Sequence, residues 1–586
     1  MRAALLFAAY PLFHLLVRLA VSEGLEYDEA EQVVLTQSLA LGYPAVAAQP
    51  PLYTWLQYLF FALFGMNVFA LAGLRALLQI LTQAALYRSA LLILDHRTIA
   101  MLAALSLWLI PQFSVESMRK THSVLATCLT AVLLHALLRV WRSGGVATYL
   151  WLGTALGLGV LAKYNFAIVA GALLLAGVWV EPVRRRLLDR RLWLGLGVAG
   201  LLLAPHLTWL LQHLDAATAQ MGKRVGGWTT REWTIRGAAH RCWSFGSDPF
   251  GYLPPVMLHL AVFGRPREAA SEAAATVARL LERFWLIAFG VLIVGVIVTS
   301  MARFHAHWLQ PFLVFLSLYM FLRRPSASPS PRAIAVFAAV LAMAMVLLMG
   351  WRLVELWSGH HLRALSRLNT PYPELARRIA ETGFRRGVII ADHHLVGGNL
   401  RFVLQDTTVV TRRMAEAGAV VPPGPCLIVW DARSSRGSRT GSFPGSPRAA
   451  SRHRPRVTLR RAGRAPNARS SAWGSFSCPA VGGRERLERS WPGCLQRRHD
   501  RGHLRQQADL RREERGVLEP VLPRRRHGAA CSSSPATASG QCSIGGCRSS
   551  STTVPPGLRS LAGSAGSSSP RLPPPPPSST RRSKGA

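Results

Sequence analysis

The sequence predicts an α-helical polytopic membrane protein with about eleven spans, a small outer α/β domain and a disordered basic tail. Three observations lead to this fold class. Hydrophobic residues make up 50% of the chain. They stand in runs of about 17–20 residues, the length that a helix needs to cross roughly 30 Å of hydrocarbon. The segments between these runs are rich in arginine, and after Trp351 the pattern changes to short β-branched runs.

The predicted topology follows from the basic loops. With the N-terminus in the cytoplasm, all of these loops fall on the cytoplasmic side, where positively charged loops typically lie. The acidic segment Tyr27–Gln32, the loop 212–244 and everything after Trp351 then fall outside. The basic loops are His96–Arg97, Arg139–Gly145, Glu181–Arg191, Arg265–Arg283 and Arg323–Arg332. The predicted spans cover about residues 3–22, 68–94, 98–116, 122–140, 146–162, 165–180, 192–211, 245–264, 284–301, 307–322 and 333–351.

Two further apolar segments are predicted to lie in the outer interface of the membrane instead of crossing it. Pro51–Phe64 is too short for a span and carries Tyr53 and Trp55, which favour the membrane–water interface. The segment Asp28–Gly42 mixes polar and apolar residues in the way of a helix lying on the outer leaflet. Counting Pro51–Phe64 as a span would invert every later loop.

Beyond the spans (residues 1–351), residues 352–433 predict an α/β domain. Pro373–Gly383 has a helical period and a terminal glycine, and three β-branched runs at Gly387–Asp392, Thr407–Arg412 and Cys426–Asp431 predict strands. The last strand stops abruptly, so the domain is expected to be incomplete. The tail, 434–586, is rich in Arg, Ser, Pro and Gly. Two interpretations stand: a disordered tail, or translation of GC-rich DNA in a wrong frame.

The formal net charge of +39 does not by itself indicate a nucleic-acid partner, because of where the charges lie. The tail alone holds 29 Lys and Arg against seven Asp and Glu, and many of the remaining cations stand in the short loops. This distribution argues against a nucleic-acid partner. Five of the eight cysteines also lie in the tail, and the other three have no metal-ligand spacing. The sequence therefore predicts neither a metal site nor a disulfide framework, and it leaves open whether a divalent cation binds.

The most informative motif is the acidic segment after the first span. Asp28, Glu29 and Glu31 stand where carboxylates are costly and usually functional. Asp28 is predicted to be a general base that takes the proton of an acceptor hydroxyl, with its neighbours positioning the substrate. A helix from Asp28 would place Glu31 on the same face and Glu29 aside. The alternative is a solvated acidic first turn, which the helix dipole favours.

Cations gather at the outer ends of later spans. Arg119, Lys120 and His122 precede the fourth predicted span, and Lys163 stands alone in a short turn between two apolar runs. Such groups can bind a phosphate or another anionic headgroup. The alternative is that they are long side chains reaching from span ends to the interface.

Two other segments contribute candidate substrate contacts. The QPPLYTWL segment offers Gln49, Tyr53 and Trp55, with the alternative of a plain turn before an interfacial helix. The RFHAHWLQP segment places His305 and His307 at an outward turn, where contact with a headgroup is favoured over a metal pair. The ADHH segment from Ala391 is expected to lie on the surface.

Together these motifs resemble the PMT-type glycosyltransferases of the GT-C fold, which include protein O-mannosyltransferases and lipid A aminoarabinose transferases. The resemblance covers residues 1–431. It rests on the Asp-Glu pair after the first span, the PPL motif, the outward hairpin between the third and fourth spans, the K-Y turn and the late H-W-x-x-P segment. It departs from the family at Ala48–Gln49 and at His122–Ser123, where relatives often carry charged residues.

The resemblance implies an inverting hexosyl- or pentosyltransferase that uses a polyprenyl-phosphate sugar. Asp28 matches the acid assigned as catalytic, with Glu29 beside it, and Lys163 and Arg119 match positions that contact the donor phosphate. The acceptor would be lipid A or lipopolysaccharide, a glycan or a protein on the periplasmic side of the bacterial inner membrane. The competing hypotheses are a transporter or lipid flippase with Asp28 in a proton relay, which no internal repeat supports, and a structural membrane protein.

Overall fold

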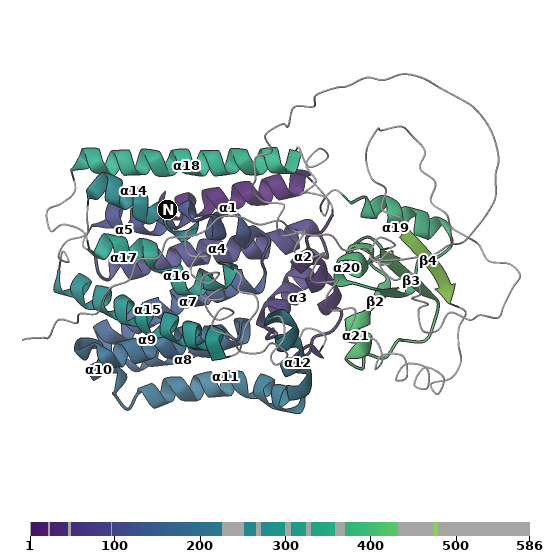
Figure 1. Ribbon diagram of the computed structural model, residues 1–586, viewed down its shortest axis with the longest axis horizontal. Helices are drawn as coiled ribbons and strands as arrows, with labels where there is room; N and C mark the ends of the chain where they lie inside the picture. Colours follow the sequence, from purple (N-terminus) through teal and green to yellow (C-terminus); the bar gives the residue numbers. More distant parts are fainter. Residues whose placement is uncertain are drawn as a thin grey trace, which may run out of the picture. The chain divides into compact units, whose positions relative to one another are not determined.

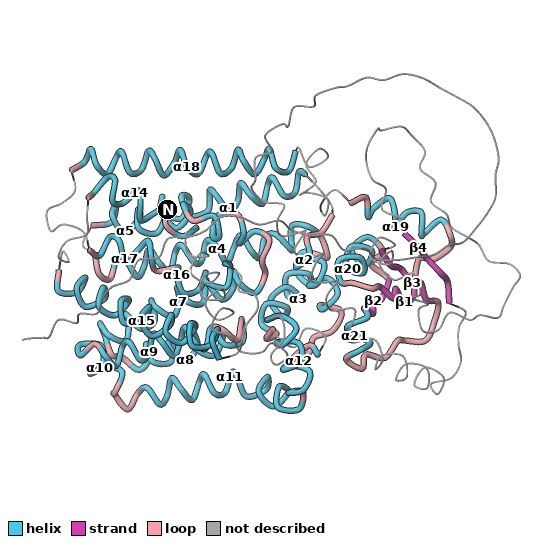
Figure 2. Tube along the Cα trace, viewed as in Figure 1, coloured by secondary structure: helices cyan, strands magenta, loops and turns pink. Residues whose placement is uncertain are grey.

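The computed structural model describes residues 2–21, 24–44, 49–94, 96–225, 251–264, 271–298, 306–323, 330–357, 368, 370–431 and 473–478. All of them lie in the first of two compact units, Met1–Leu518. Helices form nearly all of the described structure up to Trp357, and the strands belong to the segment after it (Figures 1 and 2). The predicted fold class is confirmed.

The helices of the membrane part follow one another closely along the chain. Those up to the hairpin before α7 are α1 (Arg2–Val21), α2 (Tyr27–Leu35), α3 (Leu52–Phe64), α4 (Val68–Leu91), α5 (Arg97–Leu105), η2 (Ser106–Leu109), α6 (Pro111–Ser114) and η3 (Glu116–Met118). Those after it are α7 (His122–Ser143), α8 (Val146–Ala162), α9 (Phe166–Trp179), α10 (Glu181–Leu187), α11 (Leu192–Gln212), α12 (Leu214–Val225), α14 (Pro254–Phe263), α15 (Glu272–Val298), η5 (Ala306–Leu309), α16 (Gln310–Leu313), α17 (Leu316–Leu322) and α18 (Pro331–Trp357).

Among the described residues, five helices are long and apolar enough to cross a membrane, or seven if each of two bent pairs counts as one span. Five shorter apolar helices of 10–17 residues accompany them. Each of the eleven predicted spans overlaps one of these helices, and the number that crosses the membrane stays a prediction. The short helices are Leu5–Ala20, Leu52–Phe64, Val146–Ala162, Pro254–Phe263 and His307–Leu322.

Both bent pairs have a proline in the first turn of the second helix. The helix from Arg97 to Leu109 turns by 84° into Pro111–Met118, and Phe166–Trp179 turns by 112° into α10. In both cases the residue before the second helix has extended backbone, and a proline stands in that helix's first turn. Pro182 is the second residue of α10, where proline suits a helix start. Proline disfavours helical backbone in the residue directly before it, which explains the extended backbone of Ile110 before Pro111. The predicted span 98–116 is therefore broken at Ile110.

Small residues let α8 and α11 touch along their length. A Cβ atom on Gly153 would overlap the Gly195 carbonyl, and one on Gly157 would lie 3.2 Å from Ala199 Cα. The two pairs stand four residues apart on each helix. Such spacing of small residues brings helix backbones into van der Waals contact. In lipid this packing stabilises helix association, because the hydrophobic effect does not drive helices together there.

One predicted loop is a helix. Residues 265–283 were expected to form a cytoplasmic loop, but α15 begins at Glu272. Ala274, Val277, Ala278 and Leu281 are all buried, a spacing that gives one apolar face over two turns. This apolar period outweighs the charges at Glu282 and Arg283. Residues 265–270 lie outside the described part of the chain.

The expectation that Asp28–Gly42 lies on the outer leaflet is wrong. Helix α2 ends at Leu35, and its apolar residues are buried inside the protein. Val33 packs in one apolar cluster with Leu71 of α4, and Val34 packs in another with the strands of the outer domain. The apolar face of α2 is therefore covered by protein and needs no lipid.

The outer domain combines a sheet with helices, as predicted; the parallel pairing of its first three strands was not predicted. Strand β1 pairs in parallel with both β2 and β3. The sheet order is β2-β1-β3-β4. The helix α20 was not predicted, and it connects β1 to β2. The elements are α19 (Tyr372–Glu381), β1 (Gly387–Ala391), α20 (His394–Val403), β2 (Thr407–Thr411), α21 (Arg412–Glu416) and β3 (Cys426–Asp431).

Six residues of the predicted tail extend this sheet. Strand β4 (Trp473–Cys478) pairs antiparallel with β3. The other residues of 434–586 lie outside the described part of the chain. The two interpretations of the tail's origin stay predictions.

Candidate active site

Helix α2 carries the acidic motif, and its first turn faces backbone N–H groups. Glu29 Oε2 accepts a hydrogen bond of 2.8 Å from the Glu26 N–H, which closes the turn. Asp28 is half-buried, and its Oδ2 accepts a 3.4 Å hydrogen bond from the N–H of Thr121, the residue before α7. A carboxylate at this point is favoured because the N-termini of both α2 and α7 carry partial positive charge.

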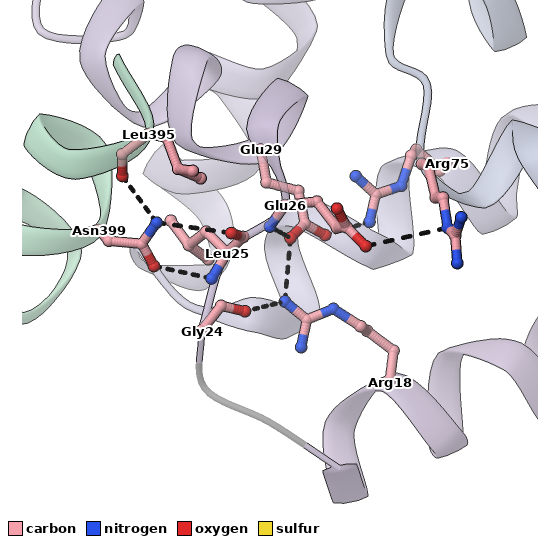
Figure 3. A network of polar contacts seen from close by, with 9 residues as sticks. Arg18, Gly24, Leu25, Glu26, Glu29, Arg75, Leu395 and Asn399 are labelled. Carbon is pink, nitrogen blue, oxygen red and sulfur yellow. Dashed lines mark hydrogen bonds and ion pairs between the residues drawn. The ribbon is translucent and has the colours of Figure 1, made fainter. Parts of the chain in front are cut away.

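Glu29 is fully buried between two guanidinium groups. Arg18 Nη2, at the end of α1, lies 2.9 Å from Glu29 Oε2 and donates to Gly24 O at 2.6 Å. Arg75 of α4 pairs with Glu29 Oε1 (Figure 3). Burial alone would raise the pKa of Glu29, but the two arginines outweigh it and lower the pKa to about 2. Because both carboxylate oxygens are paired with cations, this geometry suits a structural role better than the predicted catalytic one.

Tyr53 joins the acidic helix to α7. Its side chain is fully buried, and its ring centroid lies 5.5 Å from that of His122. The Tyr53 hydroxyl has no hydrogen-bond partner in the described residues, and it lies close enough to Asp28 and Glu29 to interact with their charges. Glu31 is buried one turn along α2 from Asp28.

The other predicted substrate contacts from the QPPLYTWL segment are Trp55 and Gln49. Trp55 donates from Nε1 to Ala40 O at 2.7 Å, so its polar atom holds the loop after α2. Gln49 is half-buried in the bend before α3. A direct substrate role for either residue stays a prediction.

The turn between α8 and α9 holds Lys163, as predicted. The side chain is only 9% exposed, and its Nζ donates a 2.8 Å hydrogen bond to Ser123 Oγ at the start of α7. His122 Nδ1 lies 3.3 Å from Ala162 O and fixes the turn from the other side. Lys163 is therefore directed into the protein, which contradicts the alternative of a side chain reaching to the interface.

Arg119 and Lys120 directly precede Thr121, the residue whose N–H contacts Asp28. Arg119 is partly exposed and lies 3.9 Å from Glu26 Oε1 and 3.8 Å from Glu116 Oε1. Lys120 is half-buried. The segment Arg119–Ser123 therefore holds two cations, the Thr121 N–H that contacts Asp28 and the Ser123 hydroxyl that contacts Lys163.

The RFHAHWLQP segment contacts the turn that holds Lys163 through Asn165. Asn165 Nδ2 donates to Trp308 O at 3.4 Å, which places the H-W-x-x-P segment beside Lys163. His307 is half-buried and packs edge-on against Trp308, with ring centroids 6.2 Å apart. His305 lies outside the described residues.

Five residues that shape this site were not among the predicted site residues. Arg18 and Arg75 are single charges within apolar helices, a signal that could have marked them. The ADHH segment is not a surface element: the His393 ring lies 4.9 Å from that of Tyr27, beside Asp28. His394 is buried, and burial lowers its pKa to about 3. Asn399 binds the chain just before α2 and had no sequence signal.

No group of three or more His, Cys, Asp or Glu side chains in the described part of the chain is arranged to hold a metal ion. The Asp28 carboxylate accepts from a backbone N–H, and the Glu29 carboxylate is paired with two arginines. Their arrangement therefore gives no support to a divalent cation at Glu29, whose two oxygens are occupied.

Comparison with known proteins points to one family. Residues 48–209 match the family described as dolichyl-phosphate-mannose-protein mannosyltransferase. The lipopolysaccharide core galacturonosyltransferase RgtB of Rhizobium johnstonii is 33% identical over 439 residues, covering 72% of this chain and 86% of that protein. RgtA of the same organism is 28% identical over 449 residues, covering 75% and 87%.

Solved structures agree on the fold. ArnT from Cupriavidus metallidurans bound to undecaprenyl phosphate has a TM-score of 0.54 and 12% identity, covering 81% of this chain and 97% of that one. Its apo structure has a TM-score of 0.50 and 16% identity, covering 73% and 93%. The transferase names of the relatives favour a glycosyltransferase over the transporter or flippase. The similarity to RgtB extends over most of both proteins, so this chain belongs to the PMT-type, GT-C-fold family of membrane glycosyltransferases that includes the lipopolysaccharide core galacturonosyltransferases.

Proposed function

We propose that this chain transfers a sugar from a polyprenyl-phosphate donor to a lipopolysaccharide acceptor on the outer side of the bacterial inner membrane. One observation carries the proposal: Asp28 and Lys163 meet the same end of α7, Asp28 at Thr121 and Lys163 at Ser123. Glycosyl transfer from a lipid phosphate needs a base near the acceptor and a cation near the leaving phosphate. This end of α7 supplies both.

In the proposed reaction, the Asp28 carboxylate takes the proton of an acceptor hydroxyl. The hydroxyl oxygen bonds to the anomeric carbon of the sugar as the bond from that carbon to the phosphate oxygen breaks. Polyprenyl phosphate leaves with the electron pair, and the single displacement inverts the anomeric configuration. Lys163, Arg119 and Lys120, together with the N-terminus of α7, stabilise the charge on the departing phosphate.

Tyr53, His122 and Glu31 are the proposed contacts to the sugar. Tyr53 and His122 form an aromatic pair between the base and the cations, and the Tyr53 hydroxyl has no hydrogen-bond partner in the described residues. A buried hydroxyl without a partner is costly, and a ligand hydroxyl would satisfy it.

The substrate class is supported by the relatives. RgtA and RgtB are named lipopolysaccharide core galacturonosyltransferases, so we propose a hexuronic acid as the sugar and the lipopolysaccharide core as the acceptor. The ArnT structure with undecaprenyl phosphate supports a lipid-phosphate donor. A donor anchored in the membrane also explains why the site is built on apolar helices.

The outer side is supported by charge. The basic segments Arg139–Gly145 and Glu181–Arg191 lie at the opposite ends of α7 and α9 from His122 and Phe166. Positively charged loops favour the cytoplasm, which leaves Asp28 and Lys163 outside.

The function is tested with purified protein and defined donors. The protein is incubated with undecaprenyl-phosphate galacturonic acid and with lipopolysaccharide from a strain that lacks the gene for this protein. Mass spectrometry should then detect a core that carries one more hexuronic acid. The matching nucleotide sugar should give no product. Transfer from the nucleotide sugar, or none from any lipid-phosphate sugar, would contradict the proposal.

Replacement of Lys163 tests the phosphate site. Charge-assisted hydrogen bonds contribute roughly 1.5–3 kcal/mol, so Lys163→Ala should lower kcat/KM for the donor about tenfold to a hundredfold. Lys163→Arg should restore part of this loss because it keeps the charge but not the geometry. Steady-state kinetics with varied donor measure the effect. Unchanged donor kinetics in Lys163→Ala would remove Lys163 from the site and leave Arg119 and Lys120 as candidates.

A further inference from the structure

Helix α20 of the outer domain holds the chain segment that leads into α2. The Leu25 N–H donates to Asn399 Oδ1 at 2.8 Å, and Asn399 Nδ2 donates to Leu25 O at 3.4 Å (Figure 3). Asn399 Nδ2 also donates to Leu395 O within α20 at 2.8 Å. Asn399 is 2% exposed. One buried amide therefore satisfies both backbone groups of a residue that lies three positions before Asp28.

The two helices also touch backbone to backbone. Gly398 faces Ala30 of α2, and a Cβ atom at Gly398 would overlap the Ala30 carbonyl. Only glycine fits at such a contact. The preceding Gly397 faces the other way, since a Cβ atom there would lie 2.6 Å from Val409 Cγ1 of β2. Consecutive glycines thus serve two different interfaces of α20.

Two further contacts hold the far end of α2. The Gln37 side chain pairs with both backbone groups of Val409, accepting from its N–H at 2.6 Å and donating to its carbonyl at 3.0 Å. Arg401 of α20 donates to Val33 O. The outer domain therefore binds the chain before α2, its middle and the turn after it.

We propose that the outer domain is a positioning element of the active site. Through Asn399 and Gly398, α20 fixes α2 so that the Asp28 carboxylate stays against Thr121 at the end of α7. This inference rests on the proposed role of Asp28. Asn399 and Gly398 are positioning residues that touch no substrate, and they act on the rate of the chemical step. A displacement of about 1 Å from productive geometry can cost roughly 10²-fold in rate.

Two alanine variants of neighbouring glycines separate positioning from folding. Gly398→Ala pushes α2 away from α20 and should lower kcat about tenfold to a hundredfold, with the donor KM nearly unchanged because Lys163 is not moved. Gly397→Ala adds the same methyl group toward β2. It should lower the unfolding temperature but leave kcat per folded molecule unchanged. Asn399→Ala should repeat the kcat loss of Gly398→Ala.

Hydrogen exchange measured by mass spectrometry on the intact protein in detergent supplies a readout that does not depend on activity. Gly398→Ala should speed exchange in peptides covering Leu25–Leu35, and Gly397→Ala should not. Unchanged exchange in Gly398→Ala would overturn the contact. Faster exchange with wild-type kcat would overturn the positioning role. If the wild-type protein transfers no lipid-phosphate sugar, the proposed function fails instead, and exchange alone decides the contact.

Discussion

Asp28→Asn is expected to lower kcat by about 10²–10⁴-fold while the protein stays folded in the membrane. This range is the typical cost of removing a general base. Asparagine keeps the shape of the side chain, and its carbonyl oxygen can still accept the hydrogen bond from the Thr121 N–H. The substitution therefore removes proton transfer with little change in packing. The measurement is single-turnover transfer from the lipid-phosphate donor, with the unfolding temperature recorded for both proteins.

Asp215→Asn provides a matched control. Asp215 is exposed and is also the second residue of its helix, α12, so the same exchange of carboxylate for amide tests the helix-dipole contribution alone. Its transfer rate should equal that of the wild type. If Asp28→Asn turns over at the wild-type rate, Asp28 is not the base, and Glu31 becomes the next candidate.

Glu29→Gln is expected to destabilise the protein by about 3–5 kcal/mol, the usual cost of removing one partner from a buried ion pair. Arg18 and Arg75 would keep their charges in a buried site with no carboxylate between them. The amide nitrogen of glutamine would also face a guanidinium donor. Thermal unfolding in detergent measures the effect. Glu181→Gln, which breaks an exposed ion pair with Arg185, should change the unfolding temperature little.

The same ion pairs predict how stability depends on pH. The folded protein holds the pKa of Glu29 at about 2, below the ordinary value of 4.5. A lowered carboxyl pKa contributes stability that is complete above the unfolded pKa and is lost as the pH falls through the folded pKa. Wild-type stability should therefore fall more steeply than that of Glu29→Gln between pH 4.5 and about 2. Parallel pH profiles for the two proteins would show that Glu29 is not ionised between the arginines.

The predicted helices and strands were confirmed where a local sequence pattern determines the secondary structure. Long apolar runs predicted helices because a helix satisfies its backbone hydrogen bonds within the segment. The β-branched runs at Gly387, Thr407 and Cys426 predicted three strands, and their parallel pairing was not predicted. The loop prediction for 265–283 failed because its charged residues suggested a loop, although the apolar period from Ala274 to Leu281 decides the helix. Helix α20 escaped prediction because paired glycines argue against a helix.

The segments of the site were also visible in the sequence. Asp28 and Lys163 stood out because charged residues beside apolar runs are costly. The sequence did not show that Asp28 contacts Thr121 and Lys163 contacts Ser123, because these contacts depend on how α2, α7 and α8 pack. The expected surface position of His393 was wrong for the same reason: its ring contact with Tyr27 joins residues that lie far apart in the chain.

The sequence by itself determined that this chain is a helical membrane protein with a small α/β domain, and it marked the acidic and basic segments of the site. Only the tertiary structure decided which carboxylate is paired. Asp28 and Glu29 are neighbours of the same chemical type, but a helix turns them to different sides. Glu29 meets Arg18 and Arg75 in the interior, and Asp28 meets the N-terminus of α7. Burial and long-range partners set the charge environment of each group, and neither is encoded in the local sequence pattern.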